Sequence, residues 1–492
     1  MTEGDLLLAI DQGTTSSRAI LFTGDGAIVA LAGEEFPQIF PRPGWVEHAP
    51  EAIWSSTVAA CRQVLQTVPG AVDRVVGIGV TNQRETTLLW DARSGKPVHN
   101  AIVWQDRRSE GLCRQLRNQG HESQVQQRTG LLLDPYFSAT KLVWLLDHVE
   151  GARQLAAAGR LRFGTVDTFL LSRLTGEYAT DATNASRTML FNLAEGQWDE
   201  ELLDLFNIPP AILPEVRDSV SDFGTTAAAL FGRPLKVRAM IGDQQSAAIG
   251  QACINPGMVK STYGTGCFVL AHMGPEPPQS RQRLLATVAW QLDGQRCYAL
   301  EGSIFVAGAA VQWLRDGLGI IAQSAETEAL ARAVSDSGGV YFVPAFAGLG
   351  APYWDPNARA AILGLSRGTG RAEIVRACLE AMAYQTHDLL TAMIADGATI
   401  ERLRIDGGMA RNDWLAQDLA DVLDRPIDRP RVTETTALGA ALLAGLGAGL
   451  YPALDAVSDV WQAERSFMPQ MSEAMRSKRL AGWHQAIARI RS

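Results

Sequence analysis

A strand–turn–strand unit with a Gly-Thr turn occurs twice in the chain, about half its length apart. The first copy joins the apolar segments 6–10 and 18–23 through Gly13-Thr14, and the second joins 258–263 and 267–272 through Gly264-Thr265. Each apolar run has the length of a buried strand, and each turn has the length of a hairpin connection. Because 492 residues are enough for two large domains, the repeat predicts two halves of similar architecture, each opening with a hairpin.

The segments after the two hairpins alternate between strand and helix patterns. The first half is expected to hold a strand over 27–36, a helix over 51–68 with Pro50 at its start, and a buried strand over 74–80. The second half is expected to hold a helix over 373–394 and a strand–turn–helix unit over 403–415. This alternation is typical of α/β proteins with buried sheets. A boundary near 252–256 gives the two predicted domains, residues 1–251 and 252–492.

Composition excludes several classes of protein. Apolar residues make up 47% of the chain, charged residues 20%, and the net charge is −9, which argues against disorder and against nucleic acid or an anionic membrane as a partner. The segment 435–454 has no charged residue, but its alanine and glycine content predicts a packed helix and no membrane insertion. Six cysteines without a C-x-x-C pair, and an acidic N-terminus unlike a signal peptide, favour a cytoplasmic protein.

Polar, glycine-rich turns follow three of the predicted strands. In residues 11–18, Asp11 ends a strand, Gly13 permits close approach to the backbone, and Arg18 can pair with phosphate oxygens. Thr265 lies between two glycines in the second hairpin, and 406–408 is an Asp-Gly-Gly turn. The first turn alone is equally consistent with a polar hairpin whose aspartate caps its own backbone. The three together favour a nucleotide site, with Asp11 able to hold Mg²⁺.

Two further strand ends carry charged side chains. Asp243 follows the apolar run 239–241, where a carboxylate can serve as a general base or can cap a helix starting near Gln245. Arg84 and Glu85 follow the strand at 74–80, and a solvated loop pair is the alternative to a binding site there. No Walker A and no G-x-G-x-x-G sequence occurs, which argues against a P-loop protein and a standard dinucleotide fold.

Taken together, these motifs resemble the FGGY family of carbohydrate kinases, and within it the glycerol kinases. The likeness runs from about residue 6 to 450 and is carried by segments 9–18, 43–48, 81–86, 101–107, 136–144, 242–245, 262–268, 348–354 and 364–368. The resemblance implies an actin-like ATPase fold, with two ribonuclease-H-like domains flanking a catalytic cleft. It implies ATP-dependent phosphorylation of glycerol to sn-glycerol 3-phosphate, with ATP and Mg²⁺. A kinase for another polyol or ketose is the alternative.

The same resemblance assigns roles to individual residues. Asp243 is the implied general base. Asp11 and Asp243 are the implied Mg²⁺ ligands. The implied glycerol-binding residues are Arg84, Glu85, Trp104, Tyr136, Asp243, Gln244 and Phe268. The implied nucleotide-binding residues are Gln12, Gly13, Thr14, Thr15, Ser16, Arg18, Thr265, Gly308, Gln312, Gly408 and Asn412. Residues 1–251 would then carry the glycerol site and first phosphate loop, and residues 252–492 the second phosphate loop and adenosine site. Without this context, Trp104 and Phe268 are typical core residues.

The resemblance also bears on assembly and regulation. Members of the family often form dimers or tetramers, so a homo-oligomer is expected, and closure of the domains about a hinge near 252–256 is expected as well. Residues 223–234 lack the basic, glycine-rich loop at which fructose bisphosphate inhibits some members. No histidine lies between His148 and His272, where others carry a phosphorylated one. Neither form of control is therefore expected.

Overall fold

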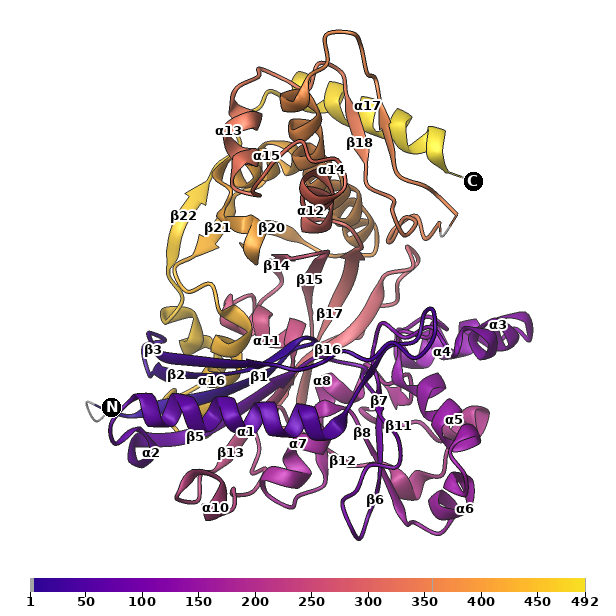
Figure 1. The fold of residues 1–492 in the computed structure, drawn as a ribbon, viewed down its shortest axis with the longest axis vertical. Coiled ribbons are helices and arrows are strands. Elements are labelled where there is room, and N and C mark those ends of the chain that lie inside the picture. Colours follow the sequence, from indigo (N-terminus) through magenta and orange to yellow (C-terminus); the bar gives the residue numbers. More distant parts are fainter. Residues whose placement is uncertain (1–3, 356, 492) are drawn as a thin grey trace.

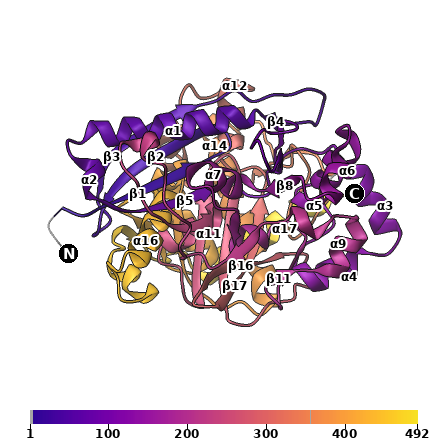
Figure 2. The same cartoon turned by 90° about the horizontal axis from the view of Figure 1, so that it is seen from below.

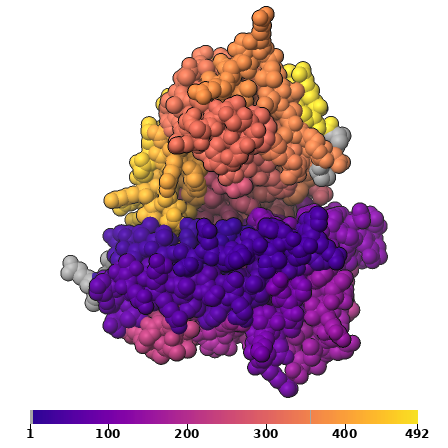
Figure 3. All heavy atoms as spheres, in the orientation of Figure 1, coloured from indigo at the N-terminus to yellow at the C-terminus, as the bar shows by residue number. Residues whose placement is uncertain are grey.

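The computed structural model describes residues 4–355 and 357–491. The chain forms two lobes, with most of the first half in the lower lobe of Figure 1 and most of the second half in the upper lobe; Figure 3 shows the same division on the surface. Each lobe is built around one large sheet. The first sheet has five strands in the order β13-β5-β1-β2-β3, and the second has seven in the order β16-β17-β15-β14-β20-β21-β22.

The two sheets share a core of the same topology. In the first sheet, β1 (Leu6–Gln12) pairs antiparallel with β2 (Ser16–Thr23) and parallel with β5 (Val75–Asn82); β3 (Ile28–Glu35) and β13 (Val237–Gly242) lie at the edges. The second sheet comprises β14 (Gly257–Tyr263), β15 (Cys267–Gly274), β16 (Leu285–Leu292), β17 (Gln295–Ile304), β20 (Ile400–Asp406), β21 (Ile427–Pro430) and β22 (Ala463–Phe467). Its order β17-β15-β14-β20-β21 repeats the order and directions of the first sheet. The predicted α/β fold with two similar halves is confirmed.

Strand β1 is buried on both faces. Leu6, Leu8 and Ile10 belong to a cluster with α1 (Pro50–Thr67), which begins at the predicted proline. Leu7 and Ala9 belong to a cluster with α16 (Thr435–Gly447). Figure 2 shows α1 running along β1, β2 and β3. A strand covered on both faces is apolar at every position, which explains the uninterrupted run that marks it in the sequence.

Helix α16 comes from the second half of the chain but packs against the first sheet. It contacts β1, β5 and β13, and it lies closest to α11 (Asp243–Gly250). The predicted packing of this alanine- and glycine-rich segment is confirmed, because most of its residues are buried. Among the described residues, no helix is long and apolar enough to span a bilayer.

The remaining elements lie around these two sheets. The segment between β5 and β13 holds β6 (Leu88–Asp91), β7 (Ala101–Ile102), α3 (Glu110–Asn118), α4 (Glu122–Thr129), α5 (Ser138–His148), α6 (Ala152–Ala157), β8 (Leu161–Gly164), α7 (Val166–Leu174), β9 (Ala179–Asp181), α8 (Ala182–Ala185), β10 (Phe191–Asn192), β11 (Gln197–Trp198), α9 (Glu200–Phe206), β12 (Glu215–Arg217) and α10 (Ala228–Phe231). The second half adds α12 (Gly308–Asp316), α13 (Glu326–Arg332), β18 (Tyr341–Val343), β19 (Ala361–Leu363), α14 (Arg371–Ala395), α15 (Asp413–Leu423) and α17 (Glu473–Ile490). Two short elements, β4 (Glu47–His48) and α2 (Ala71–Arg74), flank α1.

Candidate active site

The register of the first sheet brings the first predicted turn and the two charged strand ends to one edge. Thr81 of β5 lies opposite Asp11 of β1 on one side and Ile241 of β13 on the other. These three strands run parallel, so the residues that follow them emerge side by side. The turn after Gln12, the segment 83–85 and Asp243 are therefore neighbours.

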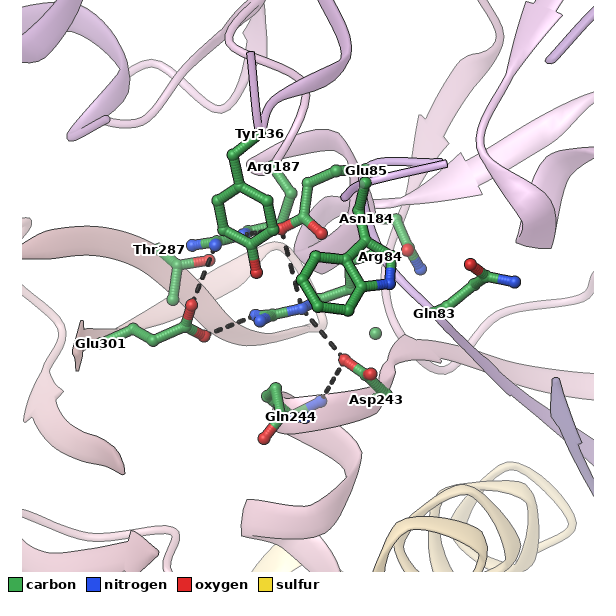
Figure 4. A network of polar contacts seen from close by, with 12 residues as sticks. Gln83, Arg84, Glu85, Tyr136, Asn184, Arg187, Asp243, Gln244, Thr287 and Glu301 are labelled. Carbon is green, nitrogen blue, oxygen red and sulfur yellow. Dashed lines mark hydrogen bonds and ion pairs between the residues drawn. The ribbon is translucent and has the colours of Figure 1, made fainter. Parts of the chain in front are cut away.

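Arg84 lies at the centre of this group and contacts both halves of the chain. Its Nε is 3.0 Å from Asp243 Oδ1, and its Nη1 donates to Glu301 Oε2 at 2.6 Å and to Gln245 Oε1 at 3.1 Å. Figure 4 shows the guanidinium between the two carboxylates. Only 2% of Arg84 and of Glu85 is exposed, so the solvated loop pair considered as an alternative is wrong.

A second arginine completes a buried network of alternating charges. Arg187 Nε donates to Glu85 Oε1 at 2.7 Å, and its Nη2 donates to Glu301 Oε1 at 2.9 Å. Burial alone would raise the pKa of Glu301, but Arg187 and Arg84 hold it down at about 2. Sequence reasoning missed Arg187 and Glu301. The one available signal was an acidic residue inside an otherwise apolar strand pattern at 298–304.

Asp243 is the first residue of α11 rather than its cap. Gly242 occupies the N-cap position, so the helix starts two residues before the predicted Gln245, and the capping alternative for Asp243 is wrong. The Asp243 side chain accepts the N–H of Gln244 at 2.7 Å and otherwise turns toward Arg84. Gln244 Oε1 in turn accepts a hydrogen bond from Lys260, a buried residue of β14. Lys260, which sequence reasoning also missed, ties the start of α11 to the second sheet.

Two of the three predicted aromatic residues meet beside this group. The rings of Trp104 and Tyr136 pack edge to face with centroids 5.7 Å apart. Trp104 Nε1 also donates to Thr14 Oγ1 at 3.0 Å, so the aromatic pair is bonded to the turn at 11–18. Phe268 comes from the second half, on β15, where it lies opposite Thr262 and Ser303.

The first predicted phosphate turn is a tight hairpin held from the side. The N–H of Gly13 donates to Ser16 O at 2.9 Å, and Gln83 Nε2 donates to Gln12 Oε1 and to Gly13 O, both at 3.0 Å. Thr15, at the tip, is exposed. Arg18 is ion-paired with Glu434, Nη1 to Oε2 at 2.7 Å, and its Nη2 lies 3.7 Å from Asp11 Oδ2. The guanidinium therefore lies beside the turn, anchored by the residue that precedes α16.

The second predicted phosphate turn is hydrogen-bonded to the start of α12. Thr265 O accepts the N–H groups of Ala307 and Ala309 at 2.9 and 3.0 Å, and Gly264 O accepts the N–H of Gly308 at 3.0 Å. These bonds bring Thr265 and Gly308 together at one helix start. Gln312 is exposed one turn further along the same helix.

The Asp-Gly-Gly turn lies next to this helix start. A Cβ on Gly308 would be 3.3 Å from Met409 Cγ, which places the short helix Gly408–Arg411 beside α12. Gly408 is exposed, while Asn412 caps α15 by accepting the N–H of Leu415 at 3.0 Å. The predicted residues Thr265, Gly308 and Gly408 of the second half thus lie around the start of α12.

The carboxylates of Asp11 and Asp243 fit a divalent cation. Asp11 is 5% exposed. Burial is the main cause that raises its pKa to about 6; Arg18 lowers it, while Asp243 and Glu434 raise it further. The two carboxylates follow β1 and β13, the strands on either side of β5, and each disfavours ionisation of the other. Carboxylate oxygens are the ligands that Mg²⁺ prefers.

Comparisons with known proteins agree with this architecture. Sequence models of the N-terminal and C-terminal domains of the FGGY family of carbohydrate kinases match residues 6–250 and 259–448. The chain is similar to a glycerol kinase of Rhodospirillum centenum (61% identical, covering 100% of this chain and 99% of the relative). It is also similar to one of Methylobacterium nodulans (60% identical, 98% and 97% covered).

Solved structures give the same result. The fold is similar to that of Plasmodium falciparum glycerol kinase crystallised with ADP, with a TM-score of 0.94, 35% identity, and 99% and 98% of the two chains covered. Gluconate kinase from Lactobacillus acidophilus has a similar fold, with a TM-score of 0.89 at 22% identity over 99% and 97% of the chains. The two family models and the curated relatives at 60–61% identity establish the family. The chain belongs to the FGGY family of carbohydrate kinases.

Proposed function

We propose that the chain catalyses transfer of the γ-phosphoryl group of ATP to a terminal hydroxyl of glycerol, giving ADP and sn-glycerol 3-phosphate. The observation that carries the proposal is the set formed by the buried Arg84 and Glu85 and the half-buried Asp243, in which the Arg84 guanidinium lies 3.0 Å from the Asp243 carboxylate at the sheet edge. The full-length similarity to proteins named glycerol kinase supports the choice of acceptor.

The acceptor site combines donors and acceptors in the proportions that a triol requires. Each glycerol hydroxyl donates one hydrogen bond and accepts others, so Arg84 supplies donors, Glu85 and Asp243 supply acceptors, and Gln244 can supply both. Trp104 and Tyr136 provide the apolar wall for the carbon chain, with Phe268 from the second half as the third member. Because Arg84 and Glu85 are buried, an acceptor that lacks a hydroxyl leaves one of these groups unpaired and is bound more weakly.

The chemistry follows from the place of Asp243. Its carboxylate accepts the proton of the terminal hydroxyl while that oxygen attacks the γ-phosphorus, and the bond from phosphorus to the bridging β-phosphate oxygen breaks. Asp11 and Asp243 would hold Mg²⁺, which when bound neutralises charge on the phosphates. For phosphoryl transfer, orientation and charge neutralisation supply most of the acceleration. Arg84, held on Glu301, keeps Asp243 facing the acceptor.

The nucleotide would lie across the two lobes. Gln12, Gly13, Thr14, Thr15, Ser16 and Arg18 would meet its phosphates from the first half, and Thr265 from the second. Gly308, Gln312, Gly408 and Asn412 would form the adenosine site. We further propose the domain division 1–251 and 252–492, closure of the lobes on substrates, a homo-oligomeric assembly and a cytoplasmic location.

A panel of acceptors tests the proposed substrate. ADP release is measured with glycerol, with other polyols and with ketoses such as xylulose, each over a range of concentrations. We expect glycerol to give the highest kcat/KM. A higher kcat/KM for a ketose would instead favour the alternative within the family, a sugar kinase.

The variant Asp243→Asn tests the mechanism. It keeps the size of the side chain and its place beside Arg84 but removes the proton acceptor, for which losses of about 10²–10⁴-fold are typical. We expect binding of ATP and glycerol, measured by calorimetry, to persist while turnover falls by that factor. Turnover within tenfold of the wild type would show that Asp243 is not the base.

A further inference from the structure

Two histidines and an aspartate come together where α17 packs on α14, in the upper lobe of Figure 1. His387 and Asp388 lie on α14 and His484 lies on α17, and one donor atom of each lies within 4.8 Å of the other two. Asp388 Oδ1 is 2.9 Å from His484 Nε2 and 3.7 Å from His387 Nδ1. The residues belong to none of the groups described above.

The Asp388 carboxylate is fixed by its other oxygen. Oδ2 accepts hydrogen bonds from Trp483 Nε1 at 2.6 Å and from the Tyr353 hydroxyl at 2.7 Å, which leaves Oδ1 to face the two imidazoles. Among the described residues, His387 Nδ1 is buried without a hydrogen-bond partner. A carboxylate oriented by outer hydrogen bonds, beside an unpartnered imidazole nitrogen, is the arrangement found around metal ligands.

We propose that His387, Asp388 and His484 bind a divalent transition-metal ion, with Zn²⁺ as the best match. Two imidazole nitrogens and one carboxylate oxygen are a ligand set that zinc accepts. With bonds of about 2.0–2.1 Å, tetrahedral ligands lie about 3.3 Å apart, between the 2.9 and 3.7 Å separations of the two pairs that include Asp388.

Small movements complete the geometry. The two imidazole nitrogens are at most 4.8 Å apart, so they need to approach by about 1.5 Å or less to reach the tetrahedral spacing. His484 is half-exposed and can make this movement, and a water molecule would fill the fourth position. The ion would fasten the C-terminal helix α17 to α14.

Zinc binding to the full-length chain, freed of metal by chelation, tests the proposal. We expect calorimetry to give about one Zn²⁺ per chain at this site, and the melting temperature to rise by several degrees with Zn²⁺ but not with Mg²⁺. His387→Gln and His484→Gln should each weaken zinc binding at least tenfold, whereas His148→Gln, on the distant helix α5, should not. Absence of zinc binding, or equal binding by the His387→Gln/His484→Gln double variant, would overturn the proposal.

A different observation carries a second inference, which rests on the proposed function. Glu301 is a residue of β17 in the second sheet, yet both of its oxygens bond to arginines of the first half, Arg84 at 2.6 Å and Arg187 at 2.9 Å. Arg187 also forms an ion pair with Glu85, with Nε 2.7 Å from Oε1. All four side chains are at most 2% exposed, so the network is a single buried unit joining both acceptor-site residues.

We infer that Glu301 and Arg187 are positioning residues for the acceptor site. Neither needs to touch the acceptor, because each acts through a neighbour: Glu301 fixes Arg84, and Arg187 fixes Glu85. Removing the Glu301 charge leaves two buried arginines with fewer carboxylates between them, and a buried charge without full compensation is costly. Arg84 would then turn toward the remaining carboxylates and no longer present its donors to an acceptor hydroxyl.

Glu301→Gln separates positioning from stability. We expect the acceptor KM to rise at least tenfold while the ATP KM stays within twofold of the wild type. The matched control is Glu380→Gln, which removes the charge of a buried carboxylate that lies 3.0 Å from Arg376 in α14. This variant should lower the melting temperature and leave both KM values within twofold. The acceptor used is whichever the panel ranks first, so the test stands even if glycerol is not that compound. An unchanged acceptor KM in Glu301→Gln would overturn the inference.

Discussion

The contact between α11 and α16 makes a sharp prediction about stability. A Cβ added at Gly439 of α16 would lie 1.8 Å from the carbonyl oxygen of Ser246 in α11. A methyl group at Gly250 of α11 would lie 2.0 Å from the carbonyl oxygen of Thr435. The two helix backbones therefore touch, and the obstructing atoms are carbonyl oxygens that cannot rotate away. Gly439→Ala can be accommodated only if one helix moves.

The size of the effect follows from this geometry. An ordinary contact of about 3.4 Å requires the helices to separate by roughly 1.5 Å, and overpacking of this kind costs about 1–3 kcal/mol. Because α16 also covers β1, β5 and β13, its displacement opens space on the sheet, which adds about 24 cal/mol for each Å³ of cavity. We expect a total of about 3 kcal/mol. At about 2 °C for each kcal/mol, the value for a cooperative unit of about 250 residues, the melting temperature falls by about 6 °C.

Differential scanning calorimetry measures this difference, and a second glycine provides the control. Gly111 lies in α3, and a Cβ there would meet no atom within 4 Å. Alanine is favoured over glycine inside a helix by up to about 1 kcal/mol, so Gly111→Ala should leave the melting temperature unchanged or raise it slightly. A melting temperature for Gly439→Ala within 2 °C of the wild type would refute the close approach of the two helices. Because α11 begins at Asp243, the variant should also lose turnover well below its melting temperature.

Three further predictions concern single side chains. Burial raises the pKa of Asp11 to about 6, so this carboxylate is protonated below that pH and then binds Mg²⁺ poorly. Calorimetry should show the affinity for MgATP falling from pH 7 to 5. The fall should be less steep in the variant Asp11→Asn. Trp104→Phe loses the 3.0 Å hydrogen bond to Thr14, which is worth about 0.5–1.5 kcal/mol. Steady-state kinetics should give a kcat/KM reduced by roughly 2–10-fold. An unchanged kcat/KM would contradict a role for this hydrogen bond in the site. Asn412→Ala removes the N-cap of α15, which contributes about 1 kcal/mol to stability, and should lower the melting temperature by a few degrees. Asn412→Asp should retain the cap and the melting temperature.

The parts of the fold that the sequence predicts well are those set by local pattern. Leu6 to Ile10 are apolar without interruption because β1 is covered on both faces, and Pro50 marks the start of α1 because a missing N–H costs nothing there. The candidate residues after β1, β5 and β13 lie at strand ends, and these parallel strands bring them together at one edge of the first sheet. Finding polar residues at strand ends needed no knowledge of distant contacts.

The residues that escaped prediction depend on contacts between distant parts of the chain. Glu301 pairs with Arg84 across 217 positions, and Arg18 pairs with Glu434 across 416. No local pattern specifies such partners, and a single charge inside an apolar strand indicates only that some partner exists. The start of α11 was misplaced because a carboxylate near a helix start usually caps it, whereas here Asp243 enters the helix and faces Arg84.

The most direct test of the account is the stoichiometry of the reaction with wild-type enzyme. ADP and the phosphorylated product are measured together, by a coupled assay and by mass spectrometry, with ATP in the presence and absence of glycerol. The account predicts one sn-glycerol 3-phosphate for each ADP, and little ADP release without glycerol. ADP release that does not depend on glycerol, or a phosphorylated product other than glycerol 3-phosphate, would contradict it.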